Sequence, residues 1–474
     1  MAALSMAFGI ATGALEADQA ALNIVSNNVA NANTPGYTRE VAVFQENDPV
    51  TIDGQSYGDG VGIPANVSQR DNVLNQELQQ QNQNVSASAA RLSALDQVQT
   101  VFNQATNANS SSSTDATNGI SQDLSNFFDS LTSLESNPSD PSLREGVLSS
   151  ATTLASDFQS ASSQLTAQQS ALDQQTASVV SQINSLSQSI AQLNQEIQSR
   201  SPHADAGTLE DQRQQDILQL SSLVGVHQIQ TENNGLSITT SSGALLVSQN
   251  TSYALTAGPL NGSTHVYDSE GNDITSSLTS GGGQIGGVLT ARNQDIPQIL
   301  SALDTLAYDF GTQVNTVNEA GSDVNGNTGT AIFNLPSTAA GASAAISVAL
   351  TSPSQIAAAA AGQGSSNDTN LLAMANLASK TVIAGSTPTD YYSSFVASLG
   401  TLVSDVTTQN TAQQASLTQL QSQVNSLSAV DLNEEAASLE TFEQSYEAAS
   451  RIFTTLDLVM TSALNLGVQT TYSS

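Results

Sequence analysis

Both ends of the chain carry an apolar residue at every third or fourth position, and this pattern limits the possible folds more than any other feature. Such spacing places apolar side chains along one face of an amphipathic helix. The N-terminal stripe consists of Leu4, Phe8, Ala11, Leu15, Leu22, Val25 and Val29, with Asp18 in its one gap. The C-terminal stripe consists of Leu439, Phe442, Tyr446, Ala449, Phe453, Leu456, Met460 and Ala463. We therefore predict a long amphipathic helix at each end.

The N-terminal helix should stop at a tight turn. A residue that precedes proline is pushed out of the α region, and Pro35-Gly36 suits the two central positions of a type II turn. Beyond the turn, Val41 and Val43 alternate with other residues, and the stretch 58–62 is rich in glycine. Residues 37–69 are therefore predicted to be extended chain with tight turns.

Helical spacing recurs in the interior of the chain, over 74–102, 165–197 and 289–310. Asp71 is a suitable N-cap for the first of these helices. Asp140-Pro141 suits the N-cap and first position of the next, because the missing N–H of proline costs nothing there. A polar linker is expected at 107–115. The repeated spacing predicts long antiparallel helices packed as a bundle.

The middle of the chain has a different pattern. Residues 226–284 are rich in Thr, Ser and Gly, and their short β-branched runs are separated by turn signals such as Asn234-Gly235 and Asn261-Gly262. This pattern predicts a small β domain. Helix is expected to resume at Val288, and the Gly- and Ala-rich region 319–365 to form loops and a few strands.

The predicted fold class is mainly α with a small β domain. It combines a long antiparallel helical bundle, N- and C-terminal helices paired as a coiled coil, and a β module inserted mid-chain. Residues 1–70 and 431–474 would form a terminal coiled-coil and assembly domain that includes the extended segment. Residues 71–225 and 285–430 would form the bundle, with 319–365 as an excursion, and 226–284 the inserted β domain.

Charge and composition exclude several classes of function. Nine Lys and Arg stand against 42 Asp and Glu, a net charge of −33, so the chain lacks the cationic face that nucleic acids and anionic membranes require. No apolar run approaches the ~18 residues of a membrane helix, and the N-terminal segment lacks the basic and apolar regions of a secretory signal. We expect neither nucleic-acid binding nor membrane insertion.

No catalytic, cofactor or metal site is expected, and the chain is predicted not to be an enzyme. Cysteine is absent, and His203, His227 and His265 are widely spaced. Adjacent residues on a helix point about 100° apart, so Glu434-Glu435 suits a helix N-terminus rather than a catalytic carboxylate pair. The stretch Asp323–Gly329 resembles a calcium loop faintly, but its glycine is not at the sixth place and Asn334 stands at the twelfth. A tight polar turn is the other interpretation.

The stretch 21–39, ALNIVSNNVANANTPGYTR, is similar to the N-terminal signature shared by the rod, hook and hook-associated proteins of the bacterial flagellum. Residues 137–144, 283–307 and 430–449 resemble the hook-associated members in particular. The chain differs from them where a His is expected after Val314-Asn315, and its 226–284 module matches nothing specific. The motif residues that carry the resemblance are Asn31, Asn33, Thr34, Pro35, Gly36 and Tyr37.

The resemblance implies a secreted structural subunit, an adaptor at the hook–filament junction that filament assembly needs. It implies contacts with further copies of the chain in a ring or helical assembly, with hook protein and hook-associated protein 3, and with an export chaperone and the type III export apparatus. Two alternatives remain. The chain could be another axial protein of the hook or distal rod, or a secreted enzyme or adhesin with flagellar-type ends.

The terminal stripes are the predicted assembly surface. A lone pair of helices would leave part of these apolar faces exposed to water, so we expect neighbouring subunits to cover them. The residues assigned to this role are Leu4, Phe8, Leu15, Leu22, Val25, Val29, Leu439, Phe442, Tyr446, Phe453, Leu456 and Met460.

Overall fold

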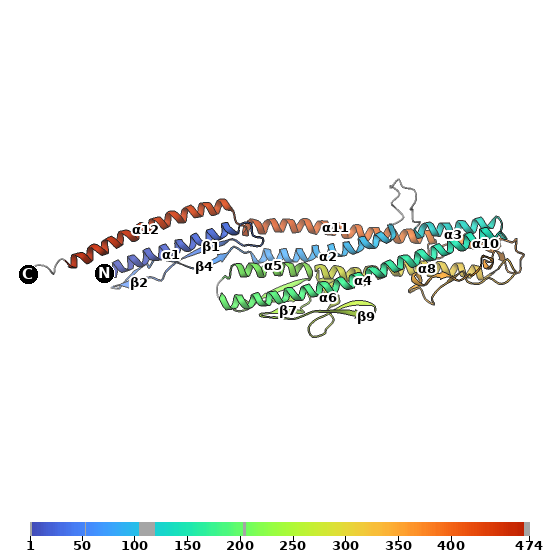
Figure 1. The fold of residues 1–474 in the computed structure, drawn as a ribbon, viewed down its shortest axis with the longest axis horizontal. Helices are drawn as coiled ribbons and strands as arrows, with labels where there is room; N and C mark the ends of the chain where they lie inside the picture. The colour runs from blue at the N-terminus through green and yellow to red at the C-terminus, as the bar shows by residue number, and fades with distance from the viewer. Residues whose placement is uncertain (1, 53, 104–118, 202–204, 469–474) are drawn as a thin grey trace, which may run out of the picture. The chain divides into compact units, whose positions relative to one another are not determined.

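The structure, a computed structural model, describes residues 2–52, 54–103, 119–201 and 205–468 (Figure 1). The predicted linker at 107–115 lies outside these residues. The chain forms two compact units, which take residues 1–83, 182–254 and 414–474 (unit 1) and residues 84–181 and 255–413 (unit 2). Three helices contribute residues to both units: α2 (Asn72–Asn103), α4 (Pro141–Arg200) and α11 (Pro388–Ser428).

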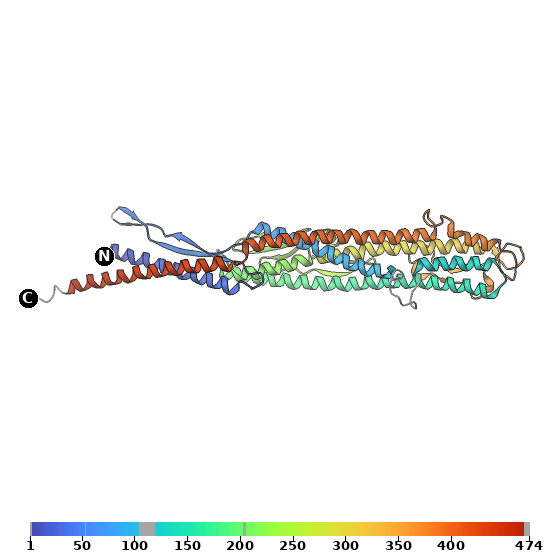
Figure 2. The same cartoon turned by 90° about the horizontal axis from the view of Figure 1, so that it is seen from above.

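In unit 1 the two terminal helices, α1 (Ala2–Asn31) and α12 (Leu432–Val468), lie side by side and antiparallel (Figures 1 and 2). Strand β1 (Glu40–Glu46) pairs with β4 (Val61–Ser68), and β2 (Val50–Ile52) forms a hairpin with β3 (Gln55–Tyr57). Both pairs are antiparallel, and the β1–β4 ribbon packs on α1. The extended chain predicted after the N-terminal helix is confirmed.

Unit 1 also contains α5 (Thr208–Leu223) and an antiparallel four-stranded sheet in the order β5–β6–β7–β8. These strands are β5 (Val226–Gln230), β6 (Leu236–Thr240), β7 (Leu245–Ser248) and β8 (Thr251–Ser252). The buried Asn194 of α4 fixes this sheet, since its amide donates to the carbonyls of Leu236 (2.8 Å) and Gln249 (2.7 Å).

Unit 2 is built around a hydrophobic core between its helices. They are α3 (Ile120–Glu135), α6 (Thr275–Gly281), α7 (Gly283–Thr290), α8 (Ile296–Glu319), α9 (Ala342–Ala345) and α10 (Thr369–Ala375). A five-residue π-helix, Ala291–Asp295, joins α7 to α8. Phe127 lies in the core with its ring centroid 5.5 Å from that of Phe310. Large apolar residues of the long helices thus supply most of this core.

The remaining strands of unit 2 are short. A hairpin joins β9 (Thr256–Leu260) and β10 (Ser263–Tyr267), and β11 (Gly321–Ser322) pairs with β14 (Ala359–Ala360). The last pair is β12 (Phe333–Asn334) with β13 (Ser347–Val348). Two short 3-10 turns, Pro353–Gln355 and Asn376–Ser379, complete the unit. This agrees with the loops and few strands predicted for 319–365.

Local sequence determines where the long helices begin. The Asp71 carboxylate accepts the N–H groups of Val73 (2.9 Å) and Leu74 (3.0 Å), and Asp140 does the same for Ser142 (2.7 Å). Both predicted N-caps are confirmed. Helix resumes at Thr275 rather than at the predicted Val288, and the Asp273 carboxylate accepts the N–H of Thr275, the first residue of α6 (2.9 Å).

The predicted fold class is confirmed: long helices dominate, the terminal helices pair, and a small antiparallel β region lies mid-chain. The strands between 226 and 267 form two separate sheets, a four-stranded one in unit 1 and the β9–β10 hairpin in unit 2. The predicted three-part domain division stays a prediction.

Candidate assembly surface

The terminal helices pack through small residues. The buried apolar side chains of α1 are Ala11, Ala17, Ala21 and Val25, and Ala449 is buried on the facing side of α12. The rings of Phe8 and Phe453 meet edge to face, with centroids 5.3 Å apart. Because small side chains remove little apolar area from water, this contact alone contributes modest stabilisation.

The structure places the predicted assembly residues unevenly. Val25 is buried, whereas Val29, Tyr446 and Phe453 are exposed. The others are half-buried: Leu4, Phe8, Leu15, Leu22, Leu439, Phe442, Leu456 and Met460. The single chain therefore covers only part of the predicted surface, and the role of these residues in assembly stays a prediction.

A second apolar face of α12, formed by Ile452 and Val459, was missed. Ile452, Leu458, Val459 and Leu464 are exposed by 57, 64, 50 and 58%. Ile452 and Val459 are seven residues apart and share a face outside the predicted stripe, and this spacing was a signal that could have shown them, whereas Leu458 and Leu464 point in other directions. A helix that is apolar on most sides is normally buried. The second half of α12 therefore has the character of a helix that packs against more than α1.

At the other end of the helix pair, a buried polar network closes the turn that follows α1. The side-chain oxygen of Asn28 accepts the Tyr37 hydroxyl (2.8 Å) and the Glu40 N–H (3.0 Å). Its amide donates to the Glu40 carbonyl (2.8 Å) and to the Glu435 carboxylate (3.1 Å). Asn28 is 1% exposed, so these bonds replace water that the side chain has lost. Burial and the nearby charges of Glu40, Asp211 and Glu435 raise the pKa of Tyr37, which therefore stays a hydrogen-bond donor.

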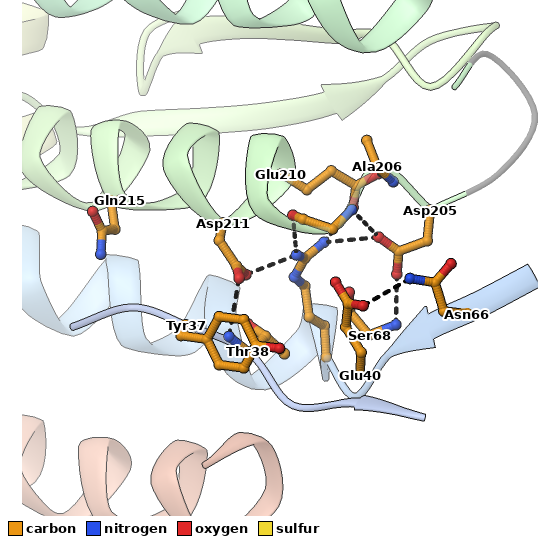
Figure 3. Close-up of polar contacts among 12 residues, drawn as sticks. Tyr37, Thr38, Glu40, Asn66, Ser68, Asp205, Ala206, Glu210, Asp211 and Gln215 are labelled. Atoms are coloured by element: carbon orange, nitrogen blue, oxygen red, sulfur yellow. Dashed lines mark hydrogen bonds and ion pairs between the residues drawn. The ribbon is translucent and has the colours of Figure 1, made fainter. Parts of the chain in front are cut away.

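The turn itself docks on α5 (Figure 3). Asp211 accepts the backbone N–H of Thr38 (3.0 Å), and one helical turn later the amide of Gln215 donates to the carbonyl of Pro35. Gly36 has φ of +79°, and a Cβ on this residue would overlap the Gln215 side chain. The positive φ therefore favours glycine at this position, and a Cβ there would also displace the end of the Gln215 side chain.

Arg70 is held by the carboxylates of Asp205, Glu210 and Asp211, which Figure 3 labels on and just before α5. Its guanidinium pairs with Glu210, with Asp211 (2.7 Å) and, more distantly, with Asp205 (3.9 Å). Burial raises the pKa of Asp205, but hydrogen bonds from the backbone of Gly207 and Ser68 and the Arg70 charge outweigh it and keep that pKa low. Asp205 therefore stays ionised, and the ion pairs of Arg70 tie the end of β4 to the start of α5.

Arg39 links the turn to α12. Its guanidinium pairs with Glu435 (2.7 Å) and Glu434 (3.0 Å), and its backbone N–H donates to the carbonyl of Ser428 (2.9 Å). Only nine of the 474 residues are Lys or Arg, so two arginines in this one polar region are a notable concentration. We call the group Asn28, Tyr37, Arg39, Glu434 and Glu435 the terminal clamp.

The predicted motif residues lie at this site but make few of its contacts. Asn31 accepts the Thr34 hydroxyl (3.1 Å) and the Tyr37 N–H donates to the Thr34 carbonyl (3.2 Å), whereas Asn33 is exposed. Asn28, Arg39, Asp211, Gln215 and Glu435 were missed as site residues. The signal available for Arg39 was the scarcity of cations in the sequence. No feature of the sequence identified Asp211 and Gln215 of α5 as contacts of the turn, because nothing in the sequence links residue 38 to residue 211.

The Asp323 stretch is a tight polar turn. The Asp323 carboxylate accepts the N–H groups of Asn325 and Asn327 (both 2.8 Å) and the Asn327 amide (3.1 Å). The carboxylate oxygens of Asp323 therefore accept hydrogen bonds from N–H groups of the turn itself. Within the described residues no group of three or more His, Cys, Asp or Glu could hold a metal ion, and no described helix is long and apolar enough to span a membrane. His203 lies outside the described residues.

Known families match two parts of the chain. Residues 109–333 match the model of the flagellar hook-associated protein FlgK helical domain, and residues 8–38 match that of the flagella basal body rod protein. The second match includes most of α1 and the turn that the terminal clamp closes.

Individual relatives extend the similarity over nearly the whole chain. Flagellar hook-associated protein 1 of Salmonella typhimurium is 28% identical over 69% of this chain, which spans 59% of the Salmonella protein. The proteins of the same name from Escherichia coli and Bacillus subtilis are 25 and 27% identical over 96 and 98% of this chain, and over 98 and 99% of their own lengths. The solved structure of the flagellar hook junction protein FlgK from Burkholderia pseudomallei superposes with a TM-score of 0.65, at 19% identity, over 73% of this chain and 99% of that one. This likeness concerns the fold.

Proposed function

Because the chain belongs to the family of flagellar hook-associated protein 1, we propose that it is a structural subunit of the bacterial flagellum and the adaptor at the hook–filament junction. The observation that carries this proposal is the combination of matches: a helical-domain model at 109–333 together with relatives aligned over both terminal helices. The alternative assignment to rod or hook has less support, because the rod model covers only residues 8–38.

The role is mechanical. Proteins of this family are structural parts of the flagellum that assemble with other axial components. The uncovered apolar face of α12 suits such packing, because its burial against neighbours would release ordered water and add the contact area that the α1–α12 pair lacks. In this proposal the neighbours are further copies of the chain, hook protein below and hook-associated protein 3 above. Before assembly, an export chaperone would shield α12 and the type III apparatus would deliver the unfolded chain.

Deletion of the gene in its own bacterium tests the proposal. Electron microscopy should show hooks of normal length without filaments, and flagellin should accumulate in the medium. A plasmid copy of the unaltered gene should restore filaments. Deletion cells that carry normal filaments would contradict the proposed function.

A further inference from the structure

The two C-terminal helices are separated by a break that other parts of the chain span. Helix α11 ends at Ser428 and α12 begins at Leu432. Asp431 caps the second helix by accepting the N–H of Asn433 (2.8 Å). The ladder of helical hydrogen bonds is interrupted here, so the direction in which α12 leaves must be set by contacts from outside the two helices.

Arg39 makes contacts on both sides of this break. Its N–H bonds the carbonyl of Ser428, the last residue of α11, and its guanidinium pairs with Glu434 and Glu435 in the first turn of α12. The rigid planar fork of an arginine suits such a double contact better than the point charge of a lysine. Arg39 is itself fixed in place, because Asp211 holds the preceding residue, Thr38, to α5.

Glu435 carries the link on to α1. One of its oxygens accepts the Arg39 guanidinium (2.7 Å) and the other accepts the Asn28 amide (3.1 Å). Glu435 is 1% exposed. A buried carboxylate is tolerated only when it is paired and hydrogen-bonded, so this position strongly favours the closed arrangement over one in which α12 swings away.

From these contacts we infer that Arg39 and Glu435 are positioning residues that fix the bend between α11 and α12, and thereby set where the exposed apolar face of α12 points. The inference rests on the proposed function for its consequence, since that face is the one expected to pack against neighbouring subunits. The N-terminal turn thereby gains a specific role, because a residue that follows the turn controls the direction of the C-terminal helix.

A distance measurement on the free chain tests this directly. The chain has no cysteine, so nitroxide labels can be attached to Gln414→Cys on α11 and Glu443→Cys on α12, both exposed. Pulsed electron paramagnetic resonance should give one narrow distribution of the distance between the two labels for the otherwise unaltered chain. Arg39→Gln should lose it and give a broad distribution. Arg200→Gln is the matched control, because it removes a 70% exposed arginine whose partner Glu196 lies 3.9 Å away, and it should stay narrow.

Unfolding of the variant must be separated from release of the bend. Arg39→Gln leaves the Glu435 carboxylate buried without its cation, which destabilises the fold. The double variant Arg39→Gln with Glu435→Gln has no buried unpaired charge, so it should fold while the distance distribution between the two labels stays broad. Circular dichroism checks the helix content. A narrow distribution in the folded double variant would overturn the inference.

The consequence for assembly is measured in cells. Cells that carry the double variant should secrete the protein yet bear fewer filaments than cells with Arg200→Gln. If the double variant has a broad distance distribution as a free chain and its cells still bear as many filaments as cells with Arg200→Gln, the link between the bend and assembly is overturned. Failure of the proposed function has a different signature, namely normal filaments in the deletion strain.

Discussion

Gln215 occupies the space in which a side chain on residue 36 would lie. The two residues belong to segments far apart in the sequence, and their contact brings the turn after α1 against α5. Asp211, four residues earlier on the same helix, holds the next part of the turn through the Thr38 N–H. The turn is therefore a docked element of unit 1, and a side chain at position 36 would displace Gln215 as well as strain the backbone at its positive φ.

The first prediction concerns this position. Gly36→Ala should lower the free energy of unfolding by more than the ~1–2 kcal/mol that a left-handed backbone costs an L residue, because the Cβ also overlaps Gln215. Gly54→Ala is the matched control: its φ is +80°, but nothing lies within 4 Å of its Cβ position. Urea unfolding compares the two, and adding Gln215→Ala to Gly36→Ala should recover the difference. Equal losses in the two single variants would count against the docked turn.

The second prediction concerns pH. Burial, a hydrogen bond with Asp157 of α4 and the charge of Asp157 together raise the pKa of Asp123 on α3 from 3.8 to about 7. Asn126 of α3 faces the same carboxyl, and Tyr392 of α11 faces Asp157. Since the folded state holds the proton more tightly than the unfolded state, the resulting stability is complete below pH 3.8 and is lost as pH rises through 7.

Asp123→Asn should remove this dependence. The amide keeps the shape of the protonated carboxyl and cannot ionise. The free energy of unfolding of the variant, measured relative to that of the unaltered chain, should therefore rise by roughly 2–4 kcal/mol from mildly acidic to neutral pH. Urea unfolding at a series of pH values gives the difference. The other carboxylates make the same contribution to the free energy of unfolding in both proteins, so their contributions cancel in the difference. Parallel pH curves for the two proteins would show that the pKa of Asp123 is not raised in the folded chain.

The third prediction concerns the uncovered face of α12. Ile452→Asp with Val459→Asp should block incorporation into the flagellum, because a charge on an apolar contact between subunits would be buried unpaired. Both side chains are half or more exposed in the single chain, so unfolding of the free protein should be unchanged. Gln444→Asp, at an exposed polar position of the same helix, is the control and should assemble. Normal incorporation of the double variant would exclude this face from the assembly.

The fourth prediction concerns the N-terminus. Helix α1 supplies half of the terminal pair, as the contact of Phe8 with Phe453 illustrates, so its removal on export would destroy the folded arrangement. Mass spectrometry of the extracellular protein should therefore recover peptides that include Leu4, Phe8 and Leu15. A mature form that begins near residue 30 would contradict export by the type III route.

Periodicity and capping rules predicted the helices well, because these depend on residues close in sequence. The stripe from Leu4 to Val29 and the caps Asp71 and Asp140 are examples. The terminal clamp could not be predicted in this way: Asn28 and Glu435 are 407 residues apart, and only the folded chain brings them together. Glu434 and Glu435 were correctly expected in the first turn of a helix, but their partner Arg39 was not. The face of α12 formed by Ile452 and Val459 could not be told from sequence alone, because the spacing rule assigns one buried stripe to each helix and does not show which further apolar residues stay uncovered.

The position of the protein in the flagellum decides whether it is the adaptor between hook and filament. An epitope inserted in the exposed turn at Glu270-Gly271, between β10 and α6, leaves both terminal helices unaltered. Immunogold electron microscopy of purified hook–basal bodies that carry short filaments then locates each copy. An adaptor should place gold only in a narrow band between the end of the hook and the start of the filament. Gold distributed along the hook, the rod or the filament would contradict this role.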